Sequence, residues 1–120
     1  MEGVPSIEVA ELEQRLAVTE DLLLVHFFSP LASGCHLLHT VLETVEPRFR
    51  ELVEIVEVEV PLLELESVRS FRIREVPTLV VFNTQREVER LECIVSPEEL
   101  SEFLEWTISF YGPISGKNAP

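Results

Sequence analysis

Two short runs of almost wholly apolar residues constrain the fold of this chain more than any other feature of its sequence. Residues Leu22 to Phe28 include His26 as their one polar side chain, and Thr78 to Phe82 include only Thr78. Runs in which consecutive residues are apolar, rather than alternate ones, are typical of strands buried on both faces of a sheet. Such a sheet needs covering layers on both sides, which 120 residues in one domain can supply.

Apolar residues at helical spacing separate the predicted strands, so strands and helices alternate along the chain. The predicted order begins with a strand or helix start at residues 6–9, a helix around Leu12 and Leu16, and strand 22–28. A helix from Cys35 to Val45, strand 53–60 and helix 62–73 follow. The chain is then expected to form strand 78–82, a hairpin partner at 87–94 and a last helix opened by Ser96, Pro97 and Glu99. Pro5-Ser6 could start the first helix. Pro47 is expected to end the second helix or to open another turn, because the residue before a proline, Glu46, is disfavoured in the α region. This order predicts one α/β domain with a mixed central sheet flanked by helices.

Composition bounds the domain and the classes of partner that it can have. We expect the domain to cover residues 1–111, with the Gly- and Pro-containing residues 112–120 as a flexible C-terminal tail. A net charge of −13 argues against nucleic acid and against an anionic membrane surface. The acidity serves either solubility or docking of a basic partner. No secretory signal is visible and only two cysteines occur, so we expect a cytoplasmic protein.

Three segments of the chain resemble the thioredoxin family, and the resemblance extends over about residues 6–109. They are Val25-His26-Phe27-Phe28 with the loop and helix after it, Ile73-Arg74-Glu75-Val76-Pro77-Thr78-Leu79, and the closing pair Glu87–Arg90 and Ser96–Leu100. The resemblance implies a thioredoxin fold. It also implies that the Val76-Pro77 peptide bond is cis and that its backbone edge lies beside the active-site loop.

The loop that matches the redox site of that family departs from its Trp-Cys-x-x-Cys pattern. Leu31 stands in the place of the tryptophan and Ala32 in the place of the first cysteine, followed by Ser33, Gly34 and Cys35. The first cysteine is the nucleophile of the family, because a helix N-terminus favours its thiolate. Ala32 cannot attack a disulfide, and Cys35 matches the recessed second cysteine that resolves the mixed intermediate. Ordinary disulfide reduction is therefore not expected.

The remaining titratable residues leave two interpretations of the cysteines open. His26 stands where family members usually hold a buried aspartate that assists proton transfer, and a histidine could also move protons near pH 7. Cys35 could act as a single reactive thiol with Cys93 as a resolving partner, provided that their Cα atoms lie within about 7 Å. Alternatively, both cysteines only pack, as free cysteines often do.

Other chemistries are poorly supported by the sequence. Cys35, His36 and His39 form a Cys-His-x-x-His run, but the three side chains cannot converge well from one helix, so no metal site is predicted. There is no serine-nucleophile motif, no pair of catalytic carboxylates and no phosphate-binding glycine loop. We expect no cofactor.

The sequence thus predicts a redox-inactive or redox-divergent thioredoxin-like domain that binds a protein partner or client. Its binding residues would be Leu31, Ala32, Ser33, Gly34, Cys35, Val76, Pro77 and Cys93. The stretch from Val25 to Leu42 also resembles the C-terminal domain of phosducin-like proteins, which implies a role in assisting protein folding, although their N-terminal helical extension is lacking. The alternative is an atypical oxidoreductase, a thiol-disulfide enzyme that uses Cys35, with or without Cys93.

Overall fold

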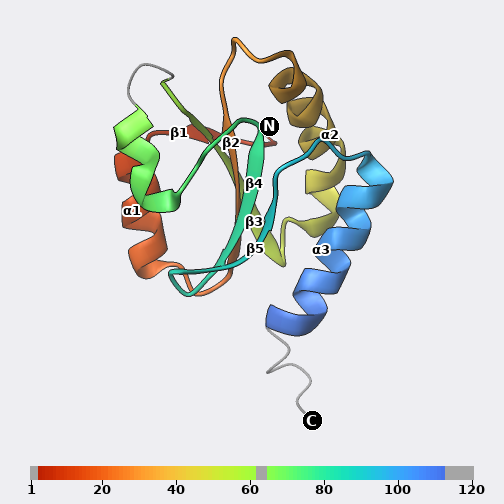
Figure 1. The fold of residues 1–120 in the computed structure, drawn as a ribbon. Coiled ribbons are helices and arrows are strands. Elements are labelled where there is room, and N and C mark those ends of the chain that lie inside the picture. The colour runs from red at the N-terminus through yellow and green to blue at the C-terminus, as the bar shows by residue number, and fades with distance from the viewer. Residues whose placement is uncertain (1–2, 62–64, 113–120) are drawn as a thin grey trace.

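The computed structural model describes residues 3–61 and 65–112, in which strands and helices alternate along the chain (Figure 1). The elements are β1 (Ser6–Ile7), α1 (Val9–Val18), β2 (Leu22–Phe28), α2 (Ser33–Phe49), β3 (Val53–Glu59), the 3₁₀ helix η1 (Leu65–Phe71), β4 (Thr78–Asn83), β5 (Arg86–Leu91) and α3 (Pro97–Tyr111). The predicted α/β architecture is confirmed, and both apolar runs form strands at nearly the expected bounds.

One mixed five-stranded sheet organises the molecule, with the strand order β1-β3-β2-β4-β5. β3 pairs in parallel with β1 and β2, whereas β4 is antiparallel to both β2 and β5. β2 and β4 therefore lie inside the sheet, where neither edge nor face meets water. This position explains why their sequences are apolar at consecutive positions.

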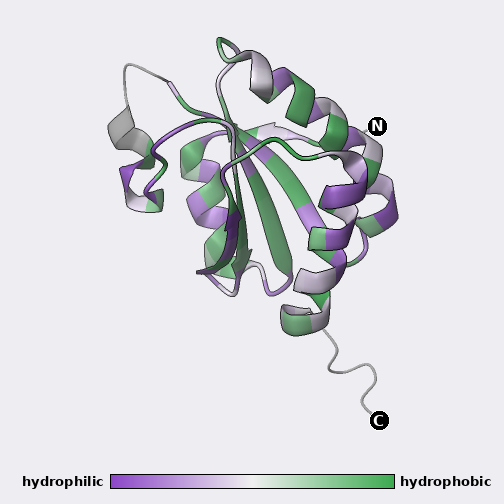
Figure 2. Cartoon of the chain, turned by 45° about the vertical axis from the view of Figure 1, so that its right-hand side comes forward, coloured by the Kyte–Doolittle hydropathy of each residue, from purple (hydrophilic) through white to green (hydrophobic). Residues whose placement is uncertain are grey.

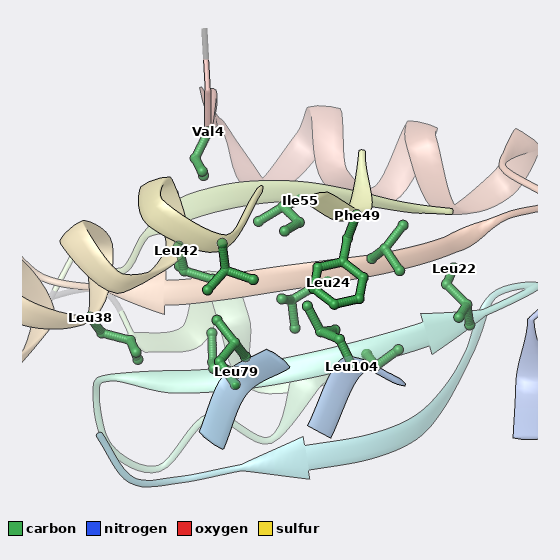
Figure 3. Close-up of a cluster of buried hydrophobic side chains, with 13 residues drawn as sticks. Val4, Leu22, Leu24, Leu38, Leu42, Phe49, Ile55, Leu79 and Leu104 are labelled. Atoms are coloured by element: carbon green, nitrogen blue, oxygen red, sulfur yellow. The ribbon is translucent and has the colours of Figure 1, made fainter. Parts of the chain in front are cut away.

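Helices cover both faces of the sheet, with α2 and α3 on one side and α1 and η1 on the other (Figure 1). Successive side chains of β2 divide between the two layers, as strand geometry requires. Leu22 and Leu24 join the cluster under α2 and α3, which Figure 3 shows with Leu38, Leu42 and Leu104. The other cluster, under α1 and η1, contains Leu12 and Val68 together with alternate residues of β2 and β3. The core is thus divided between the two faces of the sheet.

The ends of the helices show which of the helix starts and stops predicted from local sequence are confirmed. Ser96 caps α3 in a complete capping box: its hydroxyl accepts from the Glu99 backbone N–H at 3.1 Å, and the Glu99 carboxylate accepts from the Ser96 N–H at 2.9 Å. This start was predicted correctly. Of the two interpretations of residues 6–9, the strand is confirmed at Ser6–Ile7, which pairs with β3. The helix start at Pro5-Ser6 is wrong, because Glu8 is the N-cap residue of α1.

Pro47 lies inside α2, so the first of the two expectations, that the proline ends the helix, is wrong. The helix runs through Pro47 to Phe49, and Val45 and Phe49, on either side of the proline, are both buried against the sheet. Packing of these side chains outweighs the missing N–H and the ring clash of a proline near the last turn. Glu46, the residue before the proline, stays helical and its carboxylate accepts from Arg50 at 2.7 Å.

Two predicted segments lie partly or wholly outside the described residues. The helix expected at 62–73 is a 3₁₀ helix from Leu65 to Phe71, and residues 62–64 are outside the description. Of the predicted tail at 112–120, the structure describes only Gly112. Within the described part of the chain, no helix has the length and apolar character needed to cross a bilayer.

Candidate functional site

The loop between β2 and α2 is a tight turn that presents Leu31 to solvent. Ser29 is buried and holds the turn, because its carbonyl accepts from the Ala32 N–H at 3.1 Å and its hydroxyl accepts from the Leu31 N–H at 3.1 Å. Leu31 is 82% exposed, the highest value among the large apolar side chains of the described residues. The loop lies at the top of the molecule in Figure 1.

Ala32 occupies the N-cap position of α2. Its backbone is extended, and no side chain caps the first turn of the helix. A methyl group at this position provides neither a nucleophile nor an acceptor for the free N–H groups of the helix. The helix start therefore keeps the electrostatics that would favour a thiolate without having a thiol there.

Cys35 lies one turn further along α2 and is only 2% exposed. Its sulfur accepts a hydrogen bond from the Ser29 backbone N–H at 3.3 Å. Burial raises the pKa of the Cys35 thiol, the Ser29 N–H lowers it by a smaller amount, and the charge of Glu57 raises it further. The net pKa is raised, so Cys35 is a shielded, neutral thiol near pH 7.

Three separate segments meet at the start of α2. The Val76-Pro77 peptide bond is cis. A Cβ built on Gly34 would lie 3.7 Å from Pro77 Cδ and 2.7 Å from Ile94 Cδ1. The turn before β4 and the loop after β5 therefore both pack against the first turn of α2, and only a residue without a side chain fits between them in this arrangement.

The structure thus brings together the predicted residues Gly34 and Pro77, with Val76 half-buried beside the proline. Cys93 is exposed and precedes Ile94, so it belongs to the same loop. Cys35 and Cys93 are both free. Sequence reasoning missed Ile94, although an apolar side chain beside the singled-out cysteine was a visible signal.

A buried carboxylate behind the loop was also missed. Glu57 of β3 is 4% exposed, and its Oε2 lies 2.8 Å from His26 Nδ1 and 2.7 Å from His39 Nδ1. His26 comes from β2 and His39 from α2, so the three groups join the sheet to the helix that carries the site. In the sequence, Glu57 looked like one more solvated residue of an acidic run, because no local pattern reveals which strand residue faces a histidine.

The electrostatics of this buried group favour an ionised carboxylate. Burial raises the pKa of Glu57, but the hydrogen bonds from His26 and His39 and their positive charge when protonated together lower it by more. Each imidazole must carry its proton on Nδ1 to donate to Glu57. Nε2 of His26 is then buried without a hydrogen-bond partner among the residues that the structure describes. His39 Nε2 lies 3.4 Å from Glu43, so this histidine bridges two carboxylates.

The Cys35, His36 and His39 side chains do not form a binding site together. Cys35 is buried, His36 is exposed, and His39 is directed to Glu57. In residues 3–61 and 65–112, no group of three or more His, Cys, Asp or Glu side chains is arranged to hold a metal ion.

A mixed sheet of this order, with helices on both faces and a helix that starts beside an X-Pro turn, defines the thioredoxin-like class of proteins. The sequence model of the thioredoxin family matches residues 3–106, and the chain belongs to that family. It is similar to a thioredoxin-like protein of Synechocystis sp., with 24% identity over 98 residues that cover 82% of this chain and 92% of the relative.

Proposed function

We propose that this protein is a thioredoxin-like binding domain that holds an extended, apolar segment of a client protein and catalyses no disulfide exchange. The observation that carries this proposal is the contrast between two residues of one loop. Leu31 is 82% exposed, whereas Cys35, the cysteine of the matching motif, is 2% exposed. The loop therefore presents an apolar contact surface to solvent, while the Cys35 thiol is buried.

Several apolar groups extend this surface beyond Leu31. Ile94 is 48% exposed, and Val76 and Pro77 are half-buried beside it. The backbone of Val76 precedes β4 and is available to pair with an extended chain, which would give affinity without requiring one client sequence. We name Leu31 to Cys35, Val76, Pro77 and the Cys93-Ile94 loop the client surface.

The chemistry of Cys35 supports binding over catalysis. A thiol with a raised pKa is protonated at neutral pH, and a thiol that is also inaccessible cannot reach a disulfide in a folded partner. Ala32 supplies no substitute nucleophile. A co-chaperone role in the cytoplasm, similar to that of phosducin-like proteins, fits a surface that binds chains without altering them.

A turnover assay separates this proposal from the oxidoreductase alternative. Reduction of insulin disulfides by dithiothreitol is followed with wild type, Cys35→Ser and Ala32→Cys proteins. We expect wild type and Cys35→Ser to match the uncatalysed rate, and Ala32→Cys, which completes the Cys-x-x-Cys pattern, to exceed it. A wild-type rate clearly above background that Cys35→Ser abolishes would establish the single-cysteine enzyme instead.

Binding is measured with a defined probe, reduced and carboxymethylated α-lactalbumin, which stays unfolded and carries no free thiol. Leu31→Asp should weaken binding at least about tenfold, because it puts a charge at the centre of an apolar contact. Val18→Asp is the matched control, since Val18 is 77% exposed on α1 and undergoes the same change in charge. Equal losses in both variants would show that the client surface is elsewhere.

The exposed thiol of Cys93 is the one structural feature that supports the oxidoreductase alternative, because the loop that carries Cys93 contacts Gly34 through Ile94. The assay therefore includes Cys93→Ser. If a catalysed rate in wild type disappears in this variant as well as in Cys35→Ser, the two cysteines act together and the binding proposal fails.

A further inference from the structure

A second exposed apolar surface lies on the C-terminal half of α3, away from the β2–α2 loop of the client surface (Figure 1). Trp106 is 48% exposed and Phe110 is 63% exposed, and their ring centroids are 4.6 Å apart. Neither ring belongs to the two buried clusters, whereas Phe103, Ile108 and Tyr111 of the same helix pack against the core. The last turn of α3 is apolar in Figure 2 and lies at the opposite end of the molecule from the β2–α2 loop in Figure 1.

Acidic residues continue the same exposed row toward the start of α3. Glu98, Glu102, Trp106 and Phe110 are four residues apart, and all four are exposed. Positions at this spacing form one ridge of a helix, which here is about 18 Å long. The ridge is therefore acidic in its first half and aromatic in its second; we name these four residues the α3 ridge.

The charge of the α3 ridge is not neutralised within the described part of the chain. α3 contains four glutamates and no lysine or arginine. Glu99 is used in the capping box, and Glu105 pairs with Arg48 of α2 at 3.2 Å. Glu98 and Glu102 have no hydrogen bond or ion pair to any residue of the described ranges. The negative end of the helix dipole lies beside Phe110 and adds to this field.

A cavity next to the acidic half gives a cationic side chain a place to enter. It lies between α2 and α3, has a volume of about 360 Å³ and is lined by Glu98, Glu102 and Glu105 together with Arg48 and Ser101. Its single arginine faces three carboxylates. A Lys or Arg side chain of a partner would therefore find an acidic pocket one to two turns from two aromatic rings, which also attract cations through their faces.

We propose that the α3 ridge binds a basic amphipathic helix of a partner protein. A helix with apolar residues at four-residue spacing can lay its own ridge beside Trp106 and Phe110, and lysines or arginines one or two turns away then meet Glu98 and Glu102. A second copy of this chain fits poorly, because its net charge is −13 and its α3 has no basic residue to offer. The aromatic half of the α3 ridge would then bind at the end of the molecule opposite the β2–α2 loop, whereas its acidic half begins four residues after Ile94 of the client surface.

Trp106 is the only tryptophan of the chain and reports binding directly. The probe is a synthetic amidated helix of about four turns made of Leu, Lys and Ala, with Leu at four-residue spacing and no aromatic residue. Titration should shift the Trp106 emission to shorter wavelength and saturate, and added salt should weaken the affinity. The same peptide with Glu in place of Lys should leave the emission unchanged.

Variants then test where the peptide binds. Phe110→Ser should weaken binding at least about tenfold, and Glu98→Gln with Glu102→Gln should weaken it and flatten its salt dependence. Leu37→Ser is the matched control: Leu37 is 58% exposed on α2, and the change should leave binding as in wild type. Far-ultraviolet circular dichroism and urea unfolding verify that each variant is folded.

Three outcomes would overturn the proposal. Equal affinity in wild type, Phe110→Ser and the double glutamine variant would show that the peptide binds only the general acidic surface. Emission that changes with protein concentration, together with dimers in sedimentation, would assign the α3 ridge to a second copy. A red shift on removal of residues 113–120, with no response to the peptide, would assign it to the C-terminal segment of the chain itself.

Discussion

Ile94 lies against Gly34 so closely that its Cδ1 is 2.7 Å from the point where a Cβ on Gly34 would be. The contact joins the loop after β5 to the first turn of α2, at the edge of the client surface. Gly34 does not have a left-handed backbone, so its lack of a side chain matters for space and not for conformation. The contact atom is the far end of a half-exposed side chain, and this decides what a substitution does.

Gly34→Ala should change the free energy of unfolding by less than about 1 kcal/mol, because Ile94 can rotate away and alanine favours the helix. Urea unfolding measures this change. The displaced Ile94 should alter the client surface and weaken the binding of carboxymethylated α-lactalbumin about threefold or more. Leu38→Ala serves as a comparison, since Leu38 is fully buried and its loss should cost about 2–5 kcal/mol. A cost of that size for Gly34→Ala would mean that Ile94 cannot move.

The two thiols should react at very different rates with a disulfide reagent such as 5,5′-dithiobis(2-nitrobenzoate). Cys93 is exposed and should react at once at pH 7.5, whereas Cys35 is buried with a raised pKa and should react only as the protein opens or unfolds. Cys93→Ser should remove the fast phase and Cys35→Ser the slow one. Two fast phases in the wild type would contradict the shielded geometry of Cys35.

Raising the pH gives a second check on Cys35. Because its pKa is raised, the fraction of reactive thiolate should remain small through the range in which an ordinary cysteine ionises, near pH 8.5, and should grow only above it. The rate of alkylation by iodoacetamide is measured against pH in the Cys93→Ser background. A rate that levels off below pH 8 would show that the pKa of Cys35 is lowered, and this would contradict the raised pKa that its burial predicts.

Glu57 should make stability depend on pH in the acidic range. Its pKa is lower in the folded protein than in the unfolded chain, so its contribution is complete above the unfolded value, about 4.3, and disappears as the pH falls through the folded value. Glu57→Gln should therefore cost about 1–3 kcal/mol at pH 7, through the loss of two charge-assisted hydrogen bonds. The cost should shrink as the pH falls from the unfolded value toward the lowered folded pKa of Glu57, below which the wild-type carboxyl group is also neutral.

Urea unfolding of both proteins at several pH values between 3 and 7 tests this dependence. Glu59→Gln is the matched control, because Glu59 is exposed at the end of the same strand. A difference between Glu57→Gln and wild type that stays constant from pH 7 to pH 3 would show that the carboxylate charge contributes nothing at this position.

Arg90 should stabilise the protein through contacts that lysine cannot reproduce. From β5 it donates to both carboxylate oxygens of Glu87, at 2.7 and 2.8 Å, and to the backbone carbonyls of Phe71 and Arg72, at 2.8 and 3.1 Å. Its planar guanidinium donates hydrogen bonds to the end of η1 and to Glu87 of the edge strand β5 at the same time. The side chain is 19% exposed, so the contacts are partly shielded from water.

Arg90→Lys and Arg90→Ala should therefore lower the melting temperature by similar amounts, which correspond to about 1–3 kcal/mol. Arg86→Ala is the control, because Arg86 is exposed at the start of the same strand. Full recovery of stability in Arg90→Lys would mean that charge alone, and not the forked geometry, holds η1.

Much of the fold could be predicted from local sequence. The apolar runs at 22–28 and 78–82 identified β2 and β4, two of the three inner strands, because only a strand without a solvent-facing side is apolar at consecutive positions. The start of α3 followed from Ser96 and Glu99, whose capping bonds are made within one turn. Where the prediction failed, at Pro47, the deciding interaction was the burial of Phe49 against distant strands.

The candidate site also has one part that could be predicted from the sequence and one part that could not. The sequence showed which residue types stand in the β2–α2 loop and that Ala32 itself cannot act as a nucleophile, since both follow from identity and order along the chain. It could not show that Ile94 covers Gly34 or that His26 and His39 share one oxygen of Glu57. Those contacts join residues 18 to 60 positions apart and depend on sheet register and helix rotation.

By itself the sequence therefore determined the α/β class, the order of elements and the absence of a Cys-x-x-Cys pair at residues 32–35, because hydrophobic period, capping and residue identity are local properties. Only the tertiary structure decided that Cys35 is shielded and Leu31 exposed, that a buried carboxylate lies behind the loop, and that Trp106 and Phe110 remain uncovered. Burial and neighbours are set by how separate segments pack, and no local pattern contains that information.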